Sequence, residues 1–230
     1  MTTNHSTQLE GRRLIVIGAG DLGRELCAWF PDLGISAFLD GRVTQWSDPG
    51  LPPIIGSPDT YWPQPNDVFL CAVGNPAARL VVARNMEARG GQFISAIHHT
   101  ALIADSSSLG PGSIVMPYAI IDINSHLGDH SLLYFRAGVG HDAIIGGGCV
   151  LLSNAVVGSR CVLGECVVVS TLAFCNTGIS VGSFALIGAN SFAARDVPSR
   201  SSAIGVPARI VSVCSERPPA TAAVAVAVAV

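Results

Sequence analysis

A repeat of six residues runs through the second half of the chain and constrains its fold more than any other feature. From Ile103 onward every sixth residue is small and apolar for sixteen consecutive sites, and fourteen of these are Ile, Leu or Val. A β-sandwich would lose this frame, because alternation of period two drifts out of a six-residue register at each hairpin turn. The repeat therefore predicts a left-handed parallel β-helix of about five coils. The sixteen sites are Ile103, Leu109, Val115, Ile121, Leu127, Leu133, Val139, Ile145, Leu151, Val157, Leu163, Val169, Cys175, Val181, Ile187 and Ala193.

Glycines add a second period, of eighteen residues, to the same region. If three hexapeptides make one triangular coil, residues eighteen apart stack at one corner of successive coils. We expect glycine at such a corner because the backbone there needs a positive φ, which glycine adopts without strain. The stacked glycines are Gly110, Gly128, Gly146, Gly164 and Gly182.

The first hundred residues have a different pattern. An apolar, β-branched run at 13–17 leads into the glycine turn Gly18-Ala19-Gly20-Asp21-Leu22-Gly23, and a helix-like segment follows at 24–30. Strand, glycine turn and helix in this order are typical of a nucleotide-binding unit. A second strand at 35–39 ends at Asp40, where a parallel-sheet nucleotide site places an acid against a ribose or base.

Two further strands complete this unit. The run 68–73 predicts a buried third strand, and it precedes Gly74, then Asn75 as helix N-cap, and a helix to Arg89 closed by two glycines. The run 93–97 predicts a fourth strand, and the loop 41–65 is long enough to cover a site. About four strands suit one nucleotide better than a dinucleotide, for which six are usual. A nucleotide-sugar site and a purely structural unit both remain open.

The sequence thus predicts a small α/β, Rossmann-like parallel sheet followed by an all-β left-handed β-helix. We place the α/β domain at 11–98, the β-helix domain at 99–213, and a poorly ordered tail, rich in Ala and Val, at 214–230.

Composition narrows the class of function. Charged residues make up 13% of the 230 residues and the net charge is −3, which argues against nucleic-acid binding through a basic face. With 49% apolar residues, the low charge indicates surface buried in an oligomer. The N-terminus lacks the apolar core of a signal peptide and the chain lacks an eighteen-residue apolar run, so we expect a cytoplasmic protein without membrane insertion. Seven cysteines without a CxxC pair are expected to be reduced, mostly buried thiols.

One segment of the β-helix carries residues suited to catalysis. His141 lies between glycines and Asp142 follows it at once, in the run Gly138-Val139-Gly140-His141-Asp142. An imidazole can take a proton from an attacking amine or hydroxyl, and a carboxylate fixes its tautomer and stabilises the imidazolium. Gly158 and Ser159 come eighteen residues later, so their main-chain N–H groups are one coil away and are expected to donate to an oxyanion. The alternative is a surface histidine on a scaffold without catalytic activity.

Other histidines raise the question of a metal. A trimeric β-helix can hold zinc with three histidines, as gamma-class carbonic anhydrases do, and His126, His130 and His141 are the candidates. They occupy different hexapeptide phases and would aim in different directions, so we expect no metal. His98 and His99 are expected in a turn between the two domains.

The order of these motifs resembles a known family. The chain is similar over 13–211 to bacterial sugar acetyltransferases that pair a Rossmann-like domain with a left-handed β-helix, the family of the bacillosamine-pathway UDP-amino-sugar N-acetyltransferase and the sialic acid O-acetyltransferase. The matching segments are Val16-Ile17-Gly18-Ala19-Gly20, Phe38-Leu39-Asp40, Ala72-Val73-Gly74-Asn75, Ile97-His98-His99-Thr100-Ala101, Gly140-His141-Asp142 with Ile145-Gly146, Ile187-Gly188-Ala189 and Ile204-Gly205-Val206-Pro207-Ala208-Arg209.

The resemblance implies a homotrimer that binds acetyl-CoA, its co-substrate, in the groove between adjacent β-helices, with no metal. It implies that His141 is the general base and that Asp142 assists it. The nucleotide of a nucleotide-sugar substrate would be held by Gly18, Gly20, Asp40, Gly74 and Asn75. The CoA would lie along Thr171, Gly188, Ala189 and Pro207.

Two positions depart from the family pattern. Leu22 stands where members often have a histidine in the glycine turn, and Gly41 stands where they often have a second acid. Both positions adjoin the expected nucleotide. The sequence therefore leaves open which nucleotide is bound and whether an amine or a hydroxyl accepts the acetyl group. A non-catalytic, nucleotide-binding trimeric scaffold is the competing function.

Overall fold

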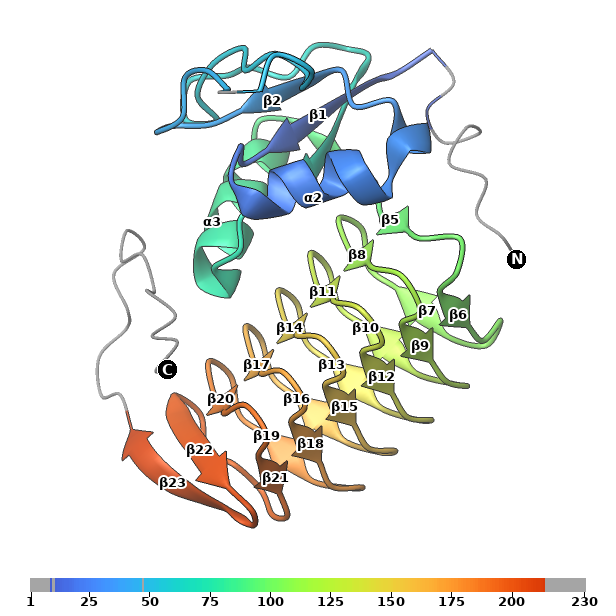
Figure 1. Cartoon of the computed structure of the whole chain (residues 1–230), viewed down its shortest axis with the longest axis vertical. Helices are drawn as coiled ribbons and strands as arrows, with labels where there is room; N and C mark the ends of the chain where they lie inside the picture. The colour runs from blue at the N-terminus through green and yellow to red at the C-terminus, as the bar shows by residue number, and fades with distance from the viewer. Residues whose placement is uncertain (1–8, 10, 47, 214–230) are drawn as a thin grey trace.

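A computed structural model of the chain describes residues 9, 11–46 and 48–213. A small α/β unit lies along one face of a long β-helix (Figure 1), which confirms the fold class predicted from the sequence. Within the described residues, no helix has the length and apolar character needed to cross a membrane. The predicted tail at 214–230, with Cys214, lies outside the described residues.

The α/β unit is a parallel sheet with one helix on each face. Its sheet has the strand order β2-β1-β3-β4. Side chains of β1 alternate between the faces, so that Leu14 and Val16 pack with α2 whereas Ile15 and Ile17 pack with α3. The loops after β1 and β3 therefore leave toward opposite faces, which creates a topological switch point between these strands. The elements are β1 (Arg13–Ile17), α2 (Asp21–Trp29), the 3-10 helix η1 (Pro31–Leu33), β2 (Ala37–Leu39), β3 (Asp67–Cys71), α3 (Pro76–Glu87) and β4 (Gln92–Phe93).

The predicted fourth strand at 93–97 is wrong in one respect, because the chain changes sheets within it. Ile94 N–H donates to the Phe69 carbonyl in the α/β sheet, whereas Ala96 N–H donates to the Ser113 carbonyl in the β-helix. The short apolar run does not by itself say which sheet it joins. β5 (Ala96–Ile97) accordingly pairs with the β-helix. α3 also ends at Glu87 and not at Arg89.

The long loop at 41–65 returns along the edge of the α/β sheet. Phe38 N–H donates to the Pro53 carbonyl over 2.8 Å, and Ile55 N–H donates to the Phe38 carbonyl over 2.9 Å. This part of the loop therefore extends the sheet beyond β2.

The β-helix is a triangular prism of three sheets. Each sheet is named here by how many strands it has within the described residues. The eight-stranded sheet contains β5, β8 (Ile114–Val115), β11 (Leu132–Leu133), β14 (Val150–Leu151), β17 (Val168–Val169), β20 (Leu186–Ile187), β22 (Ser201–Gly205) and β23 (Ala208–Val213). The six-stranded sheet contains β6 (Leu102–Ile103), β9 (Ile120–Ile121), β12 (Gly138–Val139), β15 (Val156–Val157), β18 (Phe174–Cys175) and β21 (Phe192–Ala193). The five-stranded sheet contains β7 (Ser108–Leu109), β10 (His126–Leu127), β13 (Ile144–Ile145), β16 (Val162–Leu163) and β19 (Ser180–Val181).

The hexapeptide frame forms the core of the prism. Each of the sixteen frame residues is the second residue of a two-residue strand, and from Val115 to Ala193 each is buried. Burial of one such Val, Leu or Ile side chain contributes about 1.5–3 kcal/mol, which offsets the cost of ordering so many short strands. A second, mostly small set that includes Ala119, Ala137 and Ala155 fills the space between frame residues.

The stacked glycines are needed for a different reason from the one predicted. Gly110, Gly128, Gly146, Gly164 and Gly182 do not have positive φ. Their α-carbons lie so close to the next coil that a Cβ on Gly146 would be 2.6 Å from the Gly164 carbonyl carbon. A Cβ on Gly182 would be 2.3 Å from the Ser199 nitrogen. Close approach of neighbouring coils therefore selects glycine at these sites.

Positive φ occurs at another phase of the repeat, three residues after each frame residue from Leu109 to Ile187. This corner residue has positive φ at every sixth position from Gly112 to Asn190. Most of these residues are not glycine, so stacking of the coils must offset the local cost of the left-handed conformation. Asp142 is one of them, with a φ of 58°.

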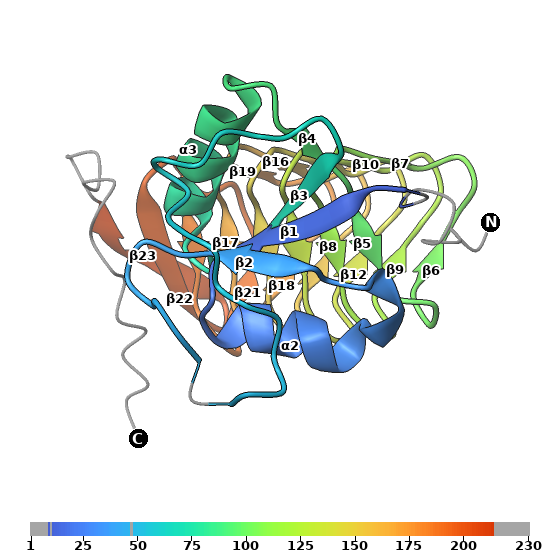
Figure 2. The ribbon, with the colours of Figure 1, turned by 90° about the horizontal axis from the view of Figure 1, so that it is seen from above.

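The α/β unit covers the eight-stranded sheet. Ile114, Leu132 and Val150 are buried in one apolar cluster with Leu22 and Leu26 of α2. Figure 2, from above, shows the α/β unit spread over this face, with α2 and α3 on opposite sides. The glycine turn and the β-helix are thereby held in one body.

Candidate active site

The His141–Asp142 pair lies at the edge of the prism between β12 and β13, where the six-stranded and five-stranded sheets meet. The coils on both sides hold its backbone. Asp142 N–H donates to the Ile123 carbonyl over 3.0 Å, and the His141 carbonyl accepts from Arg160 N–H over 2.9 Å. The pair is therefore on a rigid element and not on a free loop.

The two side chains are joined by a hydrogen bond. His141 Nδ1 lies 2.7 Å from Asp142 Oδ2, and their side chains are 38% and 46% exposed. Because a carboxylate only accepts hydrogen bonds, Nδ1 carries the proton in the neutral ring and Nε2 keeps a lone pair. A partly exposed imidazole with a fixed tautomer can take a proton from a substrate at Nε2.

Asp142 remains ionised because of its neighbours. Its pKa is lowered first by the hydrogen bond with His141, then by the hydrogen bond from Asn124, and further by the charges of His141 and Arg160. Asn124 Nδ2 lies 3.2 Å from Asp142 Oδ1. The sequence reasoning missed Asn124 and Arg160, although counting eighteen residues in either direction from Asp142 finds both.

The expected oxyanion donors do not behave alike. Gly158 N–H donates to the Cys175 carbonyl over 2.9 Å, so its expected role is wrong. The residue directly after each short strand still pairs with the next coil, whereas the residue that follows it turns the corner. Ser159 N–H accordingly donates to no acceptor within the described residues, and Ser159 is left as the candidate. A Cβ on Gly140 would lie 2.6 Å from the Ser159 nitrogen, which explains the glycine before His141.

The residues expected along CoA lie at the opposite edge of the six-stranded sheet. Thr171 lies between β17 and β18, and Gly188 and Ala189 lie between β20 and β21. Pro207 forms the exposed turn between β22 and β23. Gly188 N–H donates to the Ala203 carbonyl over 2.9 Å and so is already used, as Gly158 is. One chain therefore does not bring the His141 edge and the Thr171 edge together.

The glycine turn and Asp40 meet at the switch point of the α/β sheet. Asp40 Oδ2 accepts from Ala19 N–H over 2.8 Å, and Oδ1 accepts from Arg42 and Val43 N–H. Gly18 has a φ of 108°, and a Cβ there would be 2.9 Å from the Ala72 carbonyl oxygen. Gly20 is the N-cap of α2 and makes no side-chain cap. Asp40 thus ties the glycine turn to the end of β2.

Gly74 and Asn75 lie on the other side of this switch point. The Asn75 side chain caps α3 as predicted, by accepting from Ala78 N–H over 2.9 Å. Space around Gly74 is open, since a Cβ there would meet nothing within 4 Å. The two glycine-containing loops therefore lie on either side of the switch point, outside the carboxyl ends of β1 and β3, and the place between them, where α/β sheets bind ligands, is called the switch-point crevice below.

The three histidines considered as zinc ligands have separate partners. His126 Nδ1 lies 2.9 Å from Ser108 Oγ, and His130 Nε2 lies 3.0 Å from Glu87 Oε1. His141 is paired with Asp142. Within 9, 11–46 and 48–213, no group of three or more His, Cys, Asp and Glu residues is placed to hold a metal ion.

Comparison with known proteins places this geometry in context. No protein-family model matches the chain. Over 82 residues the chain is 30% identical to the acyl-[acyl-carrier-protein]–UDP-N-acetylglucosamine O-acyltransferase of Pseudomonas putida (strain W619), which covers 36% of this chain and 32% of the relative. The chain thus spans about a third of the length of the curated relatives it matches.

Solved structures match over nearly their whole length. The acetyltransferase domain of PglB from Neisseria gonorrhoeae FA1090, in complex with acetyl coenzyme A, is 30% identical with a TM-score of 0.80, covering 87% of this chain and all of that chain (100%). PerB from Caulobacter crescentus, in complex with CoA and GDP-perosamine, is 25% identical with a TM-score of 0.77, covering 87% and 97%. WeeI from Acinetobacter baumannii AYE shares the fold at 22% identity and a TM-score of 0.73, covering 87% and 100%.

The fold and the His141 edge define a class of protein, the hexapeptide-repeat acyltransferases with an N-terminal α/β domain. The identity to the whole PglB acetyltransferase domain then shows the family. The chain belongs to the family of the PglB acetyltransferase domain, in which an N-terminal α/β domain precedes a β-helix, and it shares this fold with PerB and WeeI. The resemblance found in the sequence is thereby confirmed.

Proposed function

We propose that the protein transfers the acetyl group of acetyl-CoA to the amino group of a nucleotide-linked amino sugar. The observation that carries the proposal is the hydrogen-bonded His141–Asp142 pair, exposed on a rigid edge of the β-helix. Its family membership supports the choice of reaction, since one relative was solved with acetyl coenzyme A and another with CoA and GDP-perosamine. An amine acceptor is favoured over a hydroxyl for the same reason.

The mechanism follows from the positions of the polar groups. The sugar amine attacks the thioester carbonyl, and His141 Nε2 takes the proton that the nitrogen loses. Asp142 stabilises the imidazolium through its hydrogen bond to Nδ1. Ser159 N–H donates to the oxyanion of the tetrahedral intermediate. When the intermediate collapses, the C–S bond breaks and the imidazolium returns its proton to the CoA sulfur.

The assembly that completes this site is a homotrimer. In one chain the His141 edge and the Thr171 edge border opposite sides of the six-stranded sheet. The outer face of that sheet is apolar and accessible, at Leu102, Ile120, Val156 and Phe174. Three copies packed through this face would bring the His141 edge of one chain against the Thr171 edge of the next. Acetyl-CoA would then lie between two chains, along Thr171, Ala189 and Pro207.

The nucleotide would bind at the switch point of the α/β sheet, between the Gly18–Gly20 turn and the Gly74–Asn75 loop. Backbone N–H groups and a helix N-terminus at this crevice suit the phosphates. In this arrangement the α/β domain selects the substrate and the β-helix domain carries out the transfer. The domain boundaries 11–98 and 99–213 stay a prediction.

The test is release of thiol from acetyl-CoA with amino-sugar nucleotides as acceptors, beginning with GDP-perosamine and its UDP and dTDP counterparts. We expect turnover in the wild type. His141→Ala should lower kcat by about 10²–10⁴-fold while the KM for acetyl-CoA stays close to the wild-type value. A near-normal kcat in a correctly assembled His141→Ala variant would leave substrate positioning alone as the source of catalysis. Binding of nucleotides without any consumption of acetyl-CoA would indicate a non-catalytic scaffold.

A further inference from the structure

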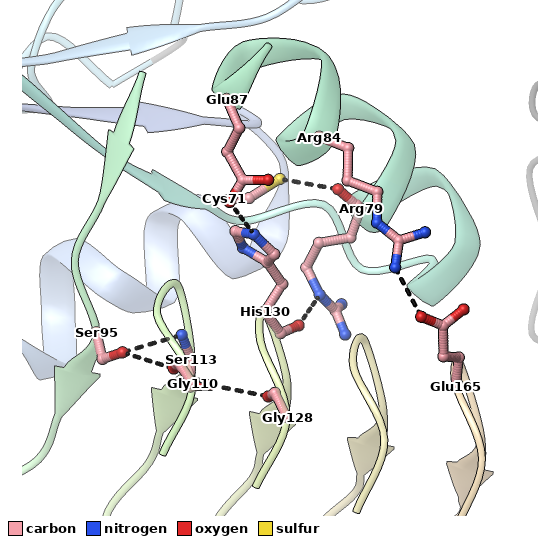
Figure 3. A network of polar contacts seen from close by, with 10 residues as sticks. All are labelled: Cys71, Arg79, Arg84, Glu87, Ser95, Gly110, Ser113, Gly128, His130 and Glu165. Carbon is pink, nitrogen blue, oxygen red and sulfur yellow. Dashed lines mark hydrogen bonds and ion pairs between the residues drawn. The ribbon is translucent and has the colours of Figure 1, made fainter. Parts of the chain in front are cut away.

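A buried arginine joins the two domains at a place where neither domain supplies a counter-charge. Arg79 lies in the first turns of α3, its side chain is 1% exposed, and it is among the largest fully buried side chains of the described residues. Figure 3 shows it pointing from α3 down to the edge of the β-helix. Burial lowers the pKa of its guanidinium. A buried charge of this kind needs a full set of hydrogen bonds to be tolerated.

Main-chain carbonyl groups supply those hydrogen bonds. Arg79 Nε donates to the His130 carbonyl over 2.8 Å, and Nη2 donates to the carbonyls of Gly148 and Cys149 over 3.0 and 3.3 Å. Nη1 donates to the carbonyls of Val73 and Gly74 over 2.8 and 3.4 Å. No carboxylate bonds to Arg79 within the described residues. Its planar fork therefore connects three separate segments of backbone.

Two of these segments belong to the β-helix and need a donor. His130 and Gly148 are corner residues with positive φ, eighteen apart on successive coils. Their carbonyls receive no main-chain N–H in the described part of the chain, although α3 covers this edge. Arg79 satisfies both, so α3 can be seated on the β-helix without leaving these acceptors unpaired.

The third segment is the loop that follows β3. Val73 and Gly74 form one wall of the switch-point crevice, opposite the Gly18 turn, which approaches Ala72 too closely to admit a Cβ. Because one guanidinium holds both this loop and the β-helix corners, the position of the crevice wall depends on the β-helix.

We propose that Arg79 is a positioning residue, which fixes the Val73–Gly74 loop so that the nucleotide is held at a set place relative to the β-helix. The proposal rests on the proposed function only in that the crevice binds the nucleotide. It predicts that loss of the fork weakens nucleotide binding and leaves acetyl-CoA binding intact, since Thr171 and Ala189 lie at the opposite edge of the eight-stranded sheet from the corners that Arg79 contacts.

A second arginine of α3 provides a matched control. Arg84 also bridges α3 to the β-helix, through an ion pair of 2.7 Å with Glu165, but it makes no contact with the loop and is 58% exposed. Both bridges are visible in Figure 3. If the Arg79 variants acted only by loosening the contact between α3 and the β-helix, Arg84→Met should therefore have the same effect on nucleotide binding.

The experiment measures two affinities in Arg79→Lys, Arg79→Met and Arg84→Met, each checked for folding by circular dichroism. The nucleotide probe is whichever of UDP, GDP, dTDP and CDP raises the wild-type melting temperature most, and its Kd and that of acetyl-CoA are measured by calorimetry. Arg79→Lys keeps the charge but loses the fork, and it decides the question if Arg79→Met does not fold. We expect the nucleotide Kd to rise about tenfold or more in the Arg79 variants, as for loss of charge-assisted hydrogen bonds that fix a binding loop. The acetyl-CoA Kd should stay within about twofold, and Arg84→Met should change neither.

Four results would overturn the proposal. An unchanged nucleotide Kd in a folded Arg79 variant would show that the loop keeps its place without the fork. If an Arg79 variant bound nucleotide and acetyl-CoA equally more weakly, Arg79 would contribute only to general stability. The same conclusion would follow if Arg84→Met raised the nucleotide Kd as much as the Arg79 variants do. A wild-type protein that binds none of the four nucleotides would overturn the proposed crevice itself, and this is seen before any variant is made.

Discussion

Asn124 holds the carboxylate of Asp142 from the neighbouring coil, with its Nδ2 atom 3.2 Å from Asp142 Oδ1. The other carboxylate oxygen, Oδ2, is bonded to His141 Nδ1. One oxygen thus bonds to the imidazole and the other to the amide, so the stacking of coils orients the His141–Asp142 pair.

Removal of the Asn124 side chain should therefore impair catalysis while the fold is kept. Asn124 has a φ of 55°, so glycine is the substitution that retains the backbone without strain. We expect Asn124→Gly to lower kcat by about 2–10-fold, because one hydrogen bond to a charged group is lost and His141 remains. Steady-state kinetics measure kcat, and a thermal melt of the same variant shows whether the fold is kept. An unchanged kcat, or a loss as large as that of His141→Ala, would contradict the orienting role.

Substitution of Asp40 should affect the sugar nucleotide more than acetyl-CoA. Asp40 accepts hydrogen bonds from three main-chain N–H groups around the glycine turn, at Ala19, Arg42 and Val43. We expect Asp40→Ala to raise the KM for the sugar nucleotide and to destabilise the fold by about 1–3 kcal/mol, since these donors lose their acceptor. Asp40→Asn keeps one carbonyl oxygen and should destabilise less. Equal rises in both KM values would indicate a folding role alone.

A charge placed on the six-stranded sheet should dissociate the proposed trimer. Phe174 is 37% exposed on the outer face of this sheet and stacks with Phe192. We expect Phe174→Arg to convert the trimer to monomers in sedimentation velocity and to abolish turnover, because a buried unpaired charge is costly. Val162, 47% exposed on the five-stranded sheet, offers the control Val162→Arg, which should remain trimeric. A stable wild-type monomer at low concentration would remove the proposed site between chains.

The stacked glycines should tolerate no side chain, whereas a glycine elsewhere in the β-helix should. A Cβ on Gly146 would meet Gly164 backbone atoms at 2.6 Å, but a Cβ on Gly138 would meet Val156 Cγ2 at an ordinary 3.6 Å. We expect Gly146→Ala to lower the free energy of unfolding by about 1–3 kcal/mol or more. Gly138→Ala should change it by less than about 1 kcal/mol, in the stabilising direction. Urea denaturation of both variants compares them, and equal losses would refute the close-approach explanation.

Asp67 should make the stability of the α/β unit dependent on pH. Burial opposes its ionisation, but hydrogen bonds from Arg13, Tyr61 and the Gln64 N–H lower its pKa below the ordinary 3.8. Burial, together with the hydrogen bond to Asp67, raises the pKa of Tyr61 to about 12, so the phenol stays a donor at neutral pH.

A carboxyl group whose pKa is lowered by folding stabilises the folded state. This contribution is complete at pH values above the pKa of the group in the unfolded chain, and it is lost as the pH falls through the pKa of the group in the folded protein. Asp67→Asn should therefore be less stable than wild type at pH 7, by about 1–3 kcal/mol for a buried charge-assisted pair. The difference in melting temperature should shrink as pH falls below about 4. A difference that stays constant from pH 7 to pH 3 would show that the ionised carboxylate does not contribute.

The β-helix could be predicted in detail because its repeat is local. Each hexapeptide is one short strand and one turn, and a single residue in six, such as Val139 or Val157, identifies the inward side. A histidine between glycines with an acid directly after it predicted the pair His141–Asp142, and the same counting placed Ser159 one coil later. It would also have found Asn124, which lies on the same corner one coil earlier.

Hydrogen-bond use by single main-chain groups could not be predicted in this way. Gly158 and Ser159 are adjacent and both fit an oxyanion donor by spacing, yet only the ladder shows that Gly158 N–H is taken by Cys175. The stacked glycines have the right period for a positive φ, but the distance to the next coil, and not φ, decides their identity.

The two-part fold, the frame of the β-helix and the place of the His141–Asp142 pair could be predicted from the sequence, because these follow from propensity and spacing within a few residues. The tertiary structure alone decided which sheet Ala96 and Ile97 join, how Asp40 is engaged, and that Arg79 serves carbonyls of His130 and Gly148. Arg79 is 51 and 69 residues from those two partners. Such contacts depend on how two finished domains pack, and a buried polar group takes whichever unpaired partner that packing brings to it.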